Sequence, residues 1–148
     1  MLYARGVAIF EHSAGAVILT EEQGELFVAL LHTDKDKWVF PKGNIQKGEE
    51  AKETAKREAQ EEIGFRGQLT FIAPLGSHQY FYRLKGDKEV RLKRVSLFLF
   101  KASGMGFLSP QREEGFLEAK WVPVNEAKEK ITFEADREAL TKAKTLWG

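Results

Sequence analysis

The sequence predicts a mixed α/β fold, and three observations lead to that class. Segments rich in Val, Ile, Leu and Phe alternate with polar, Gly-containing segments, as strands and turns do. A single long helical pattern lies between two groups of these segments. No repeat, low-complexity stretch or linker divides the 148 residues, a length typical of one domain. We therefore expect residues 1–148 to form a single domain.

The expected elements can be placed in order along the chain. Apolar runs predict strands over residues 3–10, 14–20 and 25–33. A hairpin turn is expected at Gly24, and the polar residues 34–48 predict a loop. The later elements are a helix over 49–63 ended by Gly64, strands at about 68–83 and 89–101 joined by a turn at 85–88, a loop over 103–115, a short strand near 120–123, and helices over about 125–130 and 134–146.

The composition excludes several kinds of function. Lys and Arg number 23 against 22 Asp and Glu, so the net charge indicates neither a nucleic-acid nor a membrane partner. The absence of cysteine removes disulfides, thiolate catalysis and cysteine-bound metal centres. Arg5, Glu11 and His12 interrupt the N-terminal apolar run, which is too short for a signal-peptide core or a membrane span. We expect a cytoplasmic protein.

The helix predicted over 49–63 has an apolar stripe of mostly small residues. At about 100° per residue these side chains fall on one face, and small side chains allow a helix to pack close to a sheet. The stripe consists of Ala51, Ala55, Ala59 and Ile63.

Three carboxylates, Glu58, Glu61 and Glu62, crowd the last two turns of this helix. The C-terminal end of a helix carries partial negative charge, so anions there lose about 0.3–1 kcal/mol. Glu58 and Glu62 also repel each other at a cost of about 0.2–0.5 kcal/mol. Arg57 is expected to offset one carboxylate only, that of Glu61. A solvated acidic face gives no reason for this crowding, whereas a bound Mg²⁺ or Mn²⁺ ion removes the conflict.

The spacing between this helix and the preceding loop is more specific than an acidic cluster. Seven fixed identities at about one chance in ten each coincide in about one window in 10⁷. The pattern reads Gly43, five residues, Glu49, seven residues, Arg57, Glu58, an apolar residue, one residue, Glu61, Glu62, one residue, Gly64 and a final apolar residue, Phe65.

This pattern resembles the Nudix box, the signature of the Nudix hydrolases, with Ala59 where the family more often has a larger aliphatic residue. The likeness extends from residues 14–17 through 38–43 to Trp121. The resemblance implies an α/β/α sandwich with a mixed sheet, and a hydrolase that cleaves a nucleoside diphosphate linked to another group. Such an enzyme uses water and Mg²⁺, with Mn²⁺ as a substitute, because attack on a pyrophosphate needs cations that neutralise the phosphates.

The family's roles carry over to this chain position by position. Glu58, Glu61 and Glu62 are implied as metal ligands or bases, Arg57 as the group that orients a box carboxylate, a backbone carbonyl of Lys42 or Gly43 as a further metal ligand, Glu49 as the tie between the loop and the helix start, and Glu113, Glu114 or Glu118 as a base or ligand from a later loop.

Residues 38–45, Trp-Val-Phe-Pro-Lys-Gly-Asn-Ile, resemble the approach to the box in dinucleoside polyphosphate hydrolases, notably those of diadenosine tetraphosphate and hexaphosphate. By that likeness Lys42 faces the phosphate chain. Tyr80 and Tyr82, which lie 16 and 18 residues beyond Gly64, match a Tyr that recurs in this subfamily. An aromatic ring there can stack on adenine for roughly 1–3 kcal/mol. The expected partner is a small-molecule nucleotide, with no stable nucleic-acid partner.

The hairpin expected around residues 83–94 is basic, with six cationic and two acidic side chains and a local charge of +4. Such a hairpin is either solvated or guides a polyphosphate, with Arg91 and Lys93 as candidate binding residues. The second interpretation keeps diphosphoinositol polyphosphates and 5′-triphosphorylated RNA open as substrates. A non-catalytic Nudix-fold nucleotide-binding module is a further alternative, which the intact box argues against. The charged residues are Arg83, Lys85, Asp87, Lys88, Glu89, Arg91, Lys93 and Arg94.

Overall fold

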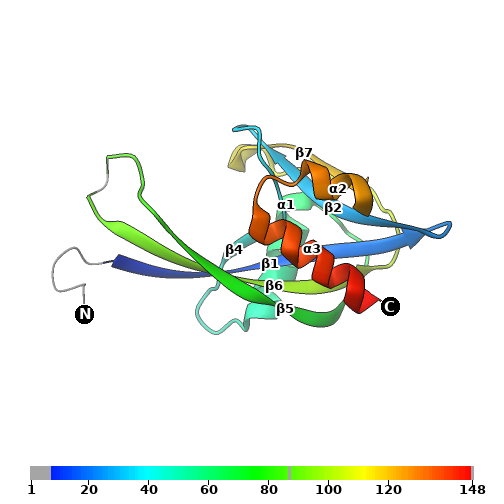
Figure 1. The fold of residues 1–148 in the computed structure, drawn as a ribbon, viewed down its shortest axis with the longest axis horizontal. Coiled ribbons are helices and arrows are strands. Elements are labelled where there is room, and N and C mark those ends of the chain that lie inside the picture. The colour runs from blue at the N-terminus through cyan, green and yellow to red at the C-terminus, as the bar shows by residue number, and fades with distance from the viewer. Residues whose placement is uncertain (1–7, 87, 148) are drawn as a thin grey trace.

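A mixed sheet of seven strands organises the protein in the computed structural model (Figure 1), which describes residues 8–86 and 88–147. The strands lie in the order β3-β2-β1-β6-β5, with β4 paired to β1 and β7 paired to β2. The strands are β1 (Ala8–Glu22), β2 (Glu25–Thr33), β3 (Trp38–Val39), β4 (Lys42–Asn44), β5 (Leu69–Tyr82), β6 (Val90–Ala102) and β7 (Phe116–Pro123). The helices are α1 (Ala51–Ile63), α2 (Val124–Lys130), α3 (Glu134–Trp147) and the short 3-10 helix η2 (Arg112–Glu114).

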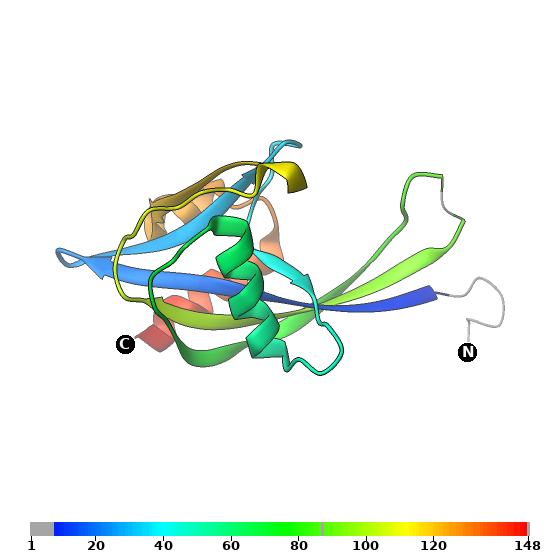
Figure 2. The same cartoon turned by 180° about the vertical axis from the view of Figure 1, so that it is seen from behind.

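Helices cover both faces of this sheet. Successive side chains of a strand point to opposite faces, so β1 supplies Val17 and Leu19 to one core and Ala16 and Ile18 to the other. The first core is closed by α2 and α3 and the second by α1. Figures 1 and 2, drawn from opposite sides, show α3 over one face and α1 over the other. The expected α/β/α sandwich with a mixed sheet is confirmed.

Strand β1 differs from expectation because it is one strand, where two strands over 3–10 and 14–20 were predicted. Residues 3–7 lie outside the described residues. The polar interruption stays in the strand because its side chains find partners: His12 Nε2 lies 2.9 Å from Ser96 Oγ, and Ser13 Oγ donates to Asn44 Oδ1 at 2.9 Å. Twelve consecutive residues of β1 therefore pair in parallel with β6 without a break.

The segment predicted as a loop over 34–48 contains two short strands, β3 and β4, which pair with β2 and β1. Helix α1 begins at Ala51 and not at residue 49, because Glu50 is its N-cap and forms a capping box with Glu53. Strand β7 begins at Phe116, earlier than the predicted 120. Strands β5 and β6 and helices α2 and α3 agree with the predicted bounds within one residue at each end.

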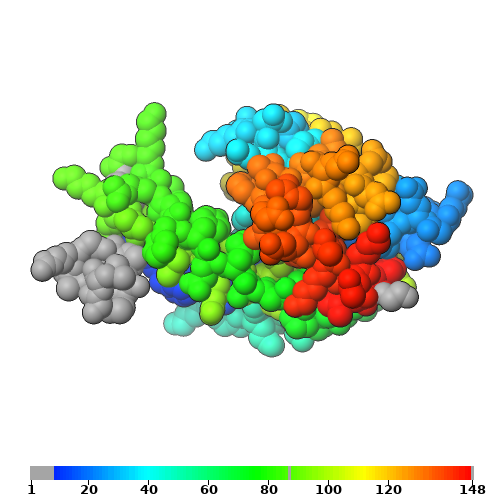
Figure 3. Space-filling view, viewed as in Figure 1, coloured from blue at the N-terminus to red at the C-terminus, as the bar shows by residue number. Residues whose placement is uncertain are grey.

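The hairpin of β5 and β6, together with the start of β1, extends beyond the helices (Figures 1 and 2). We call this extension, residues 8–12, 78–86 and 88–94, the arm. In Figure 3 the arm, in green, stands apart from the body, and a notch separates it from the cyan and orange segments. No helix in the described part of the chain is long and apolar enough to cross a membrane.

Candidate functional site

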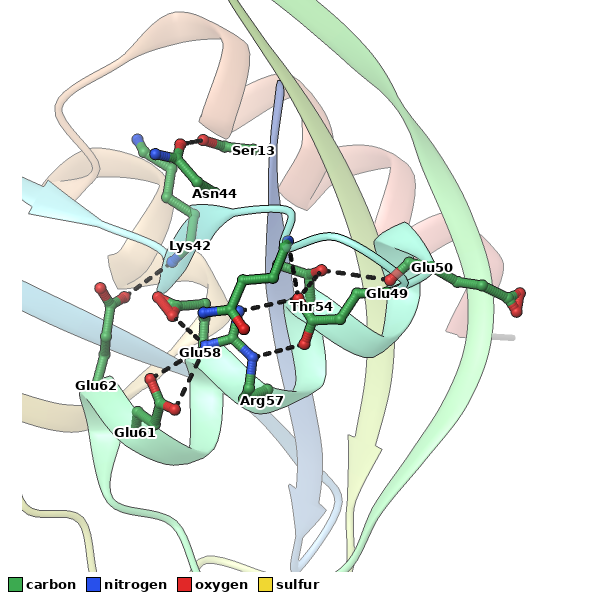
Figure 4. A network of polar contacts seen from close by, with 11 residues as sticks. Ser13, Lys42, Asn44, Glu49, Glu50, Thr54, Arg57, Glu58, Glu61 and Glu62 are labelled. Carbon is green, nitrogen blue, oxygen red and sulfur yellow. Dashed lines mark hydrogen bonds and ion pairs between the residues drawn. The ribbon is translucent and has the colours of Figure 1, made fainter. Parts of the chain in front are cut away.

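The carboxylate edge of α1, formed by Arg57, Glu58, Glu61 and Glu62, is organised by Arg57 (Figure 4). Arg57 Nε donates to Glu49 Oε2 at 2.6 Å, and Arg57 Nη1 donates to Glu58 Oε1 at 2.7 Å. Glu61, the expected partner, is more distant at 3.3 Å. The expectation of a single partner is wrong, because the forked guanidinium reaches three carboxylates at once.

Glu49 fastens the loop before α1 to the helix. Its Oε1 accepts hydrogen bonds from the Gln46 backbone N–H at 3.1 Å and from the Thr54 hydroxyl at 2.8 Å. The hydrogen bonds from Arg57, followed by those from Thr54 and Gln46, lower the pKa of Glu49 to about 2. Glu49 therefore stays ionised and ties the loop to the helix start, the position that the Nudix resemblance implies.

Glu58 explains why residue 43 is a glycine. A Cβ atom built on Gly43 would lie 2.0 Å from Glu58 Oε2, so the carboxylate of Glu58 occupies the space that any larger residue needs. Burial raises the pKa of Glu58, although its contact with Arg57 opposes this. The backbone of Gly43 and the carboxylate of Glu58 thus lie in direct contact at one end of the site.

Glu62 is the most buried carboxylate of the edge, with 9% of its surface exposed. Its Oε1 accepts a hydrogen bond from the Lys42 backbone N–H at 2.9 Å. Burial is the main cause that raises the pKa of Glu62 to about 8, and the charges of Glu58 and Glu114 add to the rise. Four carboxylates, Glu58, Glu61, Glu62 and Glu114, therefore act on one another in this region.

This donor set fits a hard divalent cation. Carboxylate and backbone carbonyl oxygens are the ligands that Mg²⁺ and Mn²⁺ prefer, and the carboxylates repel one another without a cation. Within residues 8–86 and 88–147, no three His, Asp or Glu side chains already form a metal-binding group. Glu58 and Glu61 are held by Arg57, and Glu62 by the Lys42 amide.

The structure separates the three late-loop candidates. Glu114, on η2, is the one whose charge acts on Glu62. Glu113 lines a hollow together with Glu61. Glu118 lies on β7 with its Oε1 3.5 Å from His32 Nδ1. Of the three, Glu114 is therefore the one whose charge contributes to the raised pKa of Glu62.

Lys42, whose backbone N–H binds Glu62, also lines a hollow of about 450 Å³, which we call the Lys42 hollow. Tyr80, 39% exposed, lines it, as does the buried Asp136 at the start of α3. Burial raises the pKa of Asp136, which Lys42 partly opposes. Asp136 was not predicted from the sequence, where its only signal is its place in the acidic first turn of a helix. The remaining lining residues are His78, Gln79, Phe133, Glu134 and Ala135.

Tyr82, Arg91 and Lys93 lie outside the Lys42 hollow and form a cluster on the arm. The Tyr82 hydroxyl donates to Glu11, and Arg91 Nη1 lies 3.5 Å from Glu11 Oε2. Lys93 Nζ lies 5.5 Å from the centre of the Tyr82 ring. The structure therefore brings Lys42 and Tyr80 together. Of the other three candidate binding residues, which share the face of Tyr80, Lys93 pairs with Tyr80 across the hairpin, and Tyr82 and Arg91 lie two residues farther along it.

The sequence of this chain matches a known protein family. The Nudix domain family matches residues 10–143, and the chain belongs to this family. Relatives include a protein named MutT4 from Mycobacterium tuberculosis, 33% identical over 136 residues that cover 87% of this chain and 52% of that protein. An RNA pyrophosphohydrolase from Sphingopyxis alaskensis is 39% identical over 69 residues, which cover 46% of this chain and 44% of that enzyme. The chain thus spans about half the length of these curated relatives.

The fold is shared with solved structures of the family. A Caenorhabditis elegans Ap4A hydrolase in a binary complex superposes with a TM-score of 0.73 at 24% identity, covering 93% of this chain and 97% of that one. Nudix hydrolases generally use a divalent metal ion. The resemblance of this chain to the Nudix family is therefore confirmed.

Proposed function

We propose that this chain, acting as a single Nudix domain, is a Mg²⁺-dependent pyrophosphohydrolase whose substrate is a dinucleoside polyphosphate such as diadenosine tetraphosphate. The observation that carries the proposal is the double contact of Lys42. Its backbone N–H binds Glu62, and its side chain lines the hollow that contains Tyr80. Lys42 would therefore contact both parts of a bound nucleotide, whose base would stack on Tyr80 and whose phosphates would lie at the carboxylate edge.

Glu58, Glu61, Glu62 and the carbonyl of Gly43 would hold the cation. When bound, a cation of this kind neutralises phosphate oxygens and lowers the pKa of an attacking water. Glu114 would accept a proton from that water as the water oxygen bonds to phosphorus and one P–O anhydride bond breaks. This cleavage yields two phosphorylated products.

Other residues of the chain position these groups. Arg57 holds Glu58 and Glu61 in place through its guanidinium, and Glu49 holds Arg57. The Lys42 ammonium would bind phosphate oxygens, because it lines the same hollow as Tyr80. Tyr80 would stack on the base, and burial raises the pKa of its hydroxyl, which stays protonated at neutral pH.

A second candidate substrate is 5′-triphosphorylated RNA, which one further observation supports. The rings of His78, Tyr80 and Tyr82 follow one another along β5, with centroids 6.3 Å and 6.0 Å apart. Rings in such a series can stack on successive bases of a single strand. Lys93 lies beside the last ring and adds a positive charge for the backbone.

A hydrolysis panel with Mg²⁺ tests the proposal. The substrates are diadenosine tetraphosphate, ADP-ribose, an oxidised nucleoside triphosphate, an inositol pyrophosphate and 5′-triphosphorylated RNA, with the products identified. We expect kcat/KM for diadenosine tetraphosphate to exceed that for ADP-ribose by about tenfold or more, because diadenosine tetraphosphate carries a second base and one stacked base contributes roughly 1–3 kcal/mol. Equal or reversed values would remove this substrate assignment, and a higher value for RNA would favour the second candidate.

A further inference from the structure

Phe107 is the most exposed of the large apolar side chains in the described residues, at 84%. It lies on the loop between β6 and η2, which passes the C-terminal end of α1 (Figure 2). An exposed aromatic residue needs no explanation by itself. The feature of interest is that contacts fix the backbone on either side of Phe107.

On its N-terminal side, Phe107 follows a glycine that is firmly held. The indole Nε1 of Trp121 donates to the Gly106 carbonyl at 2.9 Å. A Cβ atom at Gly106 would lie 2.9 Å from the ring of Phe65, and Phe65 packs edge-on against Trp121 at a centroid distance of 5.9 Å. Gly106 therefore sits on a packed aromatic pair.

On its C-terminal side, the loop is bonded to the end of α1. The Ser109 backbone N–H donates to the Ile63 carbonyl at 2.8 Å, and the Gln111 N–H donates to the Glu62 carbonyl at 3.0 Å. These bonds satisfy carbonyls that a helix end leaves free. The place of Phe107 relative to the carboxylate edge is thus set by contacts on both sides.

Phe107 lines a hollow of about 850 Å³, which we call the Phe107 hollow. Glu61 of the carboxylate edge also lines it, together with Arg66 and Glu113. The Lys42 hollow shares none of these residues. The carboxylate edge therefore adjoins one hollow through Lys42 and a second, larger hollow through Glu61.

We propose that the Phe107 hollow receives the second nucleoside of the substrate, with its base stacked on Phe107. The proposal rests on the proposed function. A linear substrate with a ring at each end and phosphates between them matches two hollows joined by the carboxylate edge. The charges favour a base over another phosphate group, because Glu113 balances the single cation Arg66 when Glu61 holds the metal ion, and a carboxylate accepts hydrogen bonds from an exocyclic amino group.

Two substrates that differ by one nucleoside test this assignment. Diadenosine tetraphosphate carries adenine at both ends, whereas adenosine 5′-tetraphosphate carries one. We expect Phe107→Ala to lower the ratio of kcat/KM between the first and the second about tenfold, mainly through KM, since stacking acts in ground and transition states alike. Phe107→Trp should restore the ratio, and Phe107→Leu, which is apolar but not aromatic, should not.

Leu146→Ala is the matched control, because Leu146 is an exposed apolar residue, at 44%, near the end of α3. It should leave the ratio at the wild-type value. An unchanged ratio in both Phe107→Ala and Phe107→Leu, with wild-type melting temperatures, would overturn the inference while the proposed function stands. Wild-type protein that does not prefer diadenosine tetraphosphate in the panel would instead overturn the proposed function before any variant is made.

Discussion

The carboxylate edge of α1 and the arm both gather charge, but they hold it in different ways. On α1, one guanidinium binds three carboxylates, and burial raises the pKa of Glu58 and Glu62. On the arm, Glu11 already pairs with Arg91, and the basic residues are divided between the two faces of the sheet. The first arrangement leaves negative charge that a cation can satisfy, whereas the second leaves a modest positive field.

This difference shows that clustered charges in a sequence are a weak guide to a binding site unless the partners of the charged side chains are known. The six basic residues of the hairpin look like one patch in the sequence. In the structure, Lys93 lies opposite Tyr80 while Arg94 lies opposite Gln79, so neighbouring residues face opposite sides. The carboxylates of α1 stay together because helical spacing places them on one edge.

The largest expected effect is that of Glu61→Gln, which keeps the size of the side chain and removes one charge. We expect it to lower Mg²⁺-dependent turnover by about a hundredfold or more, because Glu61 would hold the cation that neutralises the charge of the phosphates in the transition state. In chelator the variant should be at least as stable as wild type, because Glu61 is 48% exposed and an ion pair like its contact with Arg57 contributes about 0–1 kcal/mol. Kinetics and thermal melts check both statements.

Added Mg²⁺ should raise the melting temperature of wild type more than that of Glu61→Gln, since only binding to the folded state shifts unfolding. A variant that is markedly less stable than wild type in chelator would show that Glu61 is chiefly a structural partner of Arg57. The metal role would then rest on Glu58 and Glu62.

The second prediction concerns the contact between Gly43 and Glu58. Gly43→Ala places a Cβ atom 2.0 Å from Glu58 Oε2, so the carboxylate or the loop must move. We expect a loss of about 1–3 kcal/mol in the free energy of unfolding, as for other overpacked sites, together with reduced turnover. Gly104→Ala is the matched control, because nothing lies within 4 Å of a Cβ at that position. Urea unfolding compares the two, and equal losses would contradict the steric explanation.

The carboxylate edge was predictable from sequence because its geometry is local to one helix. The contact between Arg57 and Glu49 was not predictable, because Glu49 precedes the helix and the turn of the loop decides how Glu49 approaches Arg57. The Lys42 hollow could not be predicted from the spacing of residues along the sequence either. It depends on Asp136 of α3 and Tyr80 of β5 meeting Lys42, and only the packing of α3 on the sheet brings them together.

The third prediction separates two tyrosines that the sequence treats alike. Tyr80 lines the Lys42 hollow, whereas Tyr82 lies outside it with its hydroxyl bonded to Glu11. We expect Tyr80→Ala to raise KM for diadenosine tetraphosphate about tenfold, and Tyr82→Ala to raise it less. Steady-state kinetics on both variants checks the order. A larger effect at Tyr82 would move the base platform onto the arm and favour RNA as the substrate.

The smallest expected effect tests whether the arm guides phosphates at all. Lys93→Gln should raise KM by about two- to fivefold at low salt, with a larger increase for diadenosine hexaphosphate than for the tetraphosphate, because Lys93 is only partly buried and a solvent-accessible charge contributes about 0–1 kcal/mol. Arg91→Gln should have less effect, since Glu11 already neutralises Arg91. Arg94→Gln is the matched control, because Arg94 lies on the opposite face. Added salt should reduce the difference between Lys93→Gln and wild type, because a Debye length near 10 Å at 0.1 M screens such charges. If Arg94→Gln changes KM as much as Lys93→Gln does, the arm acts only through its overall charge, and the face that carries Tyr80 has no special role in binding phosphate.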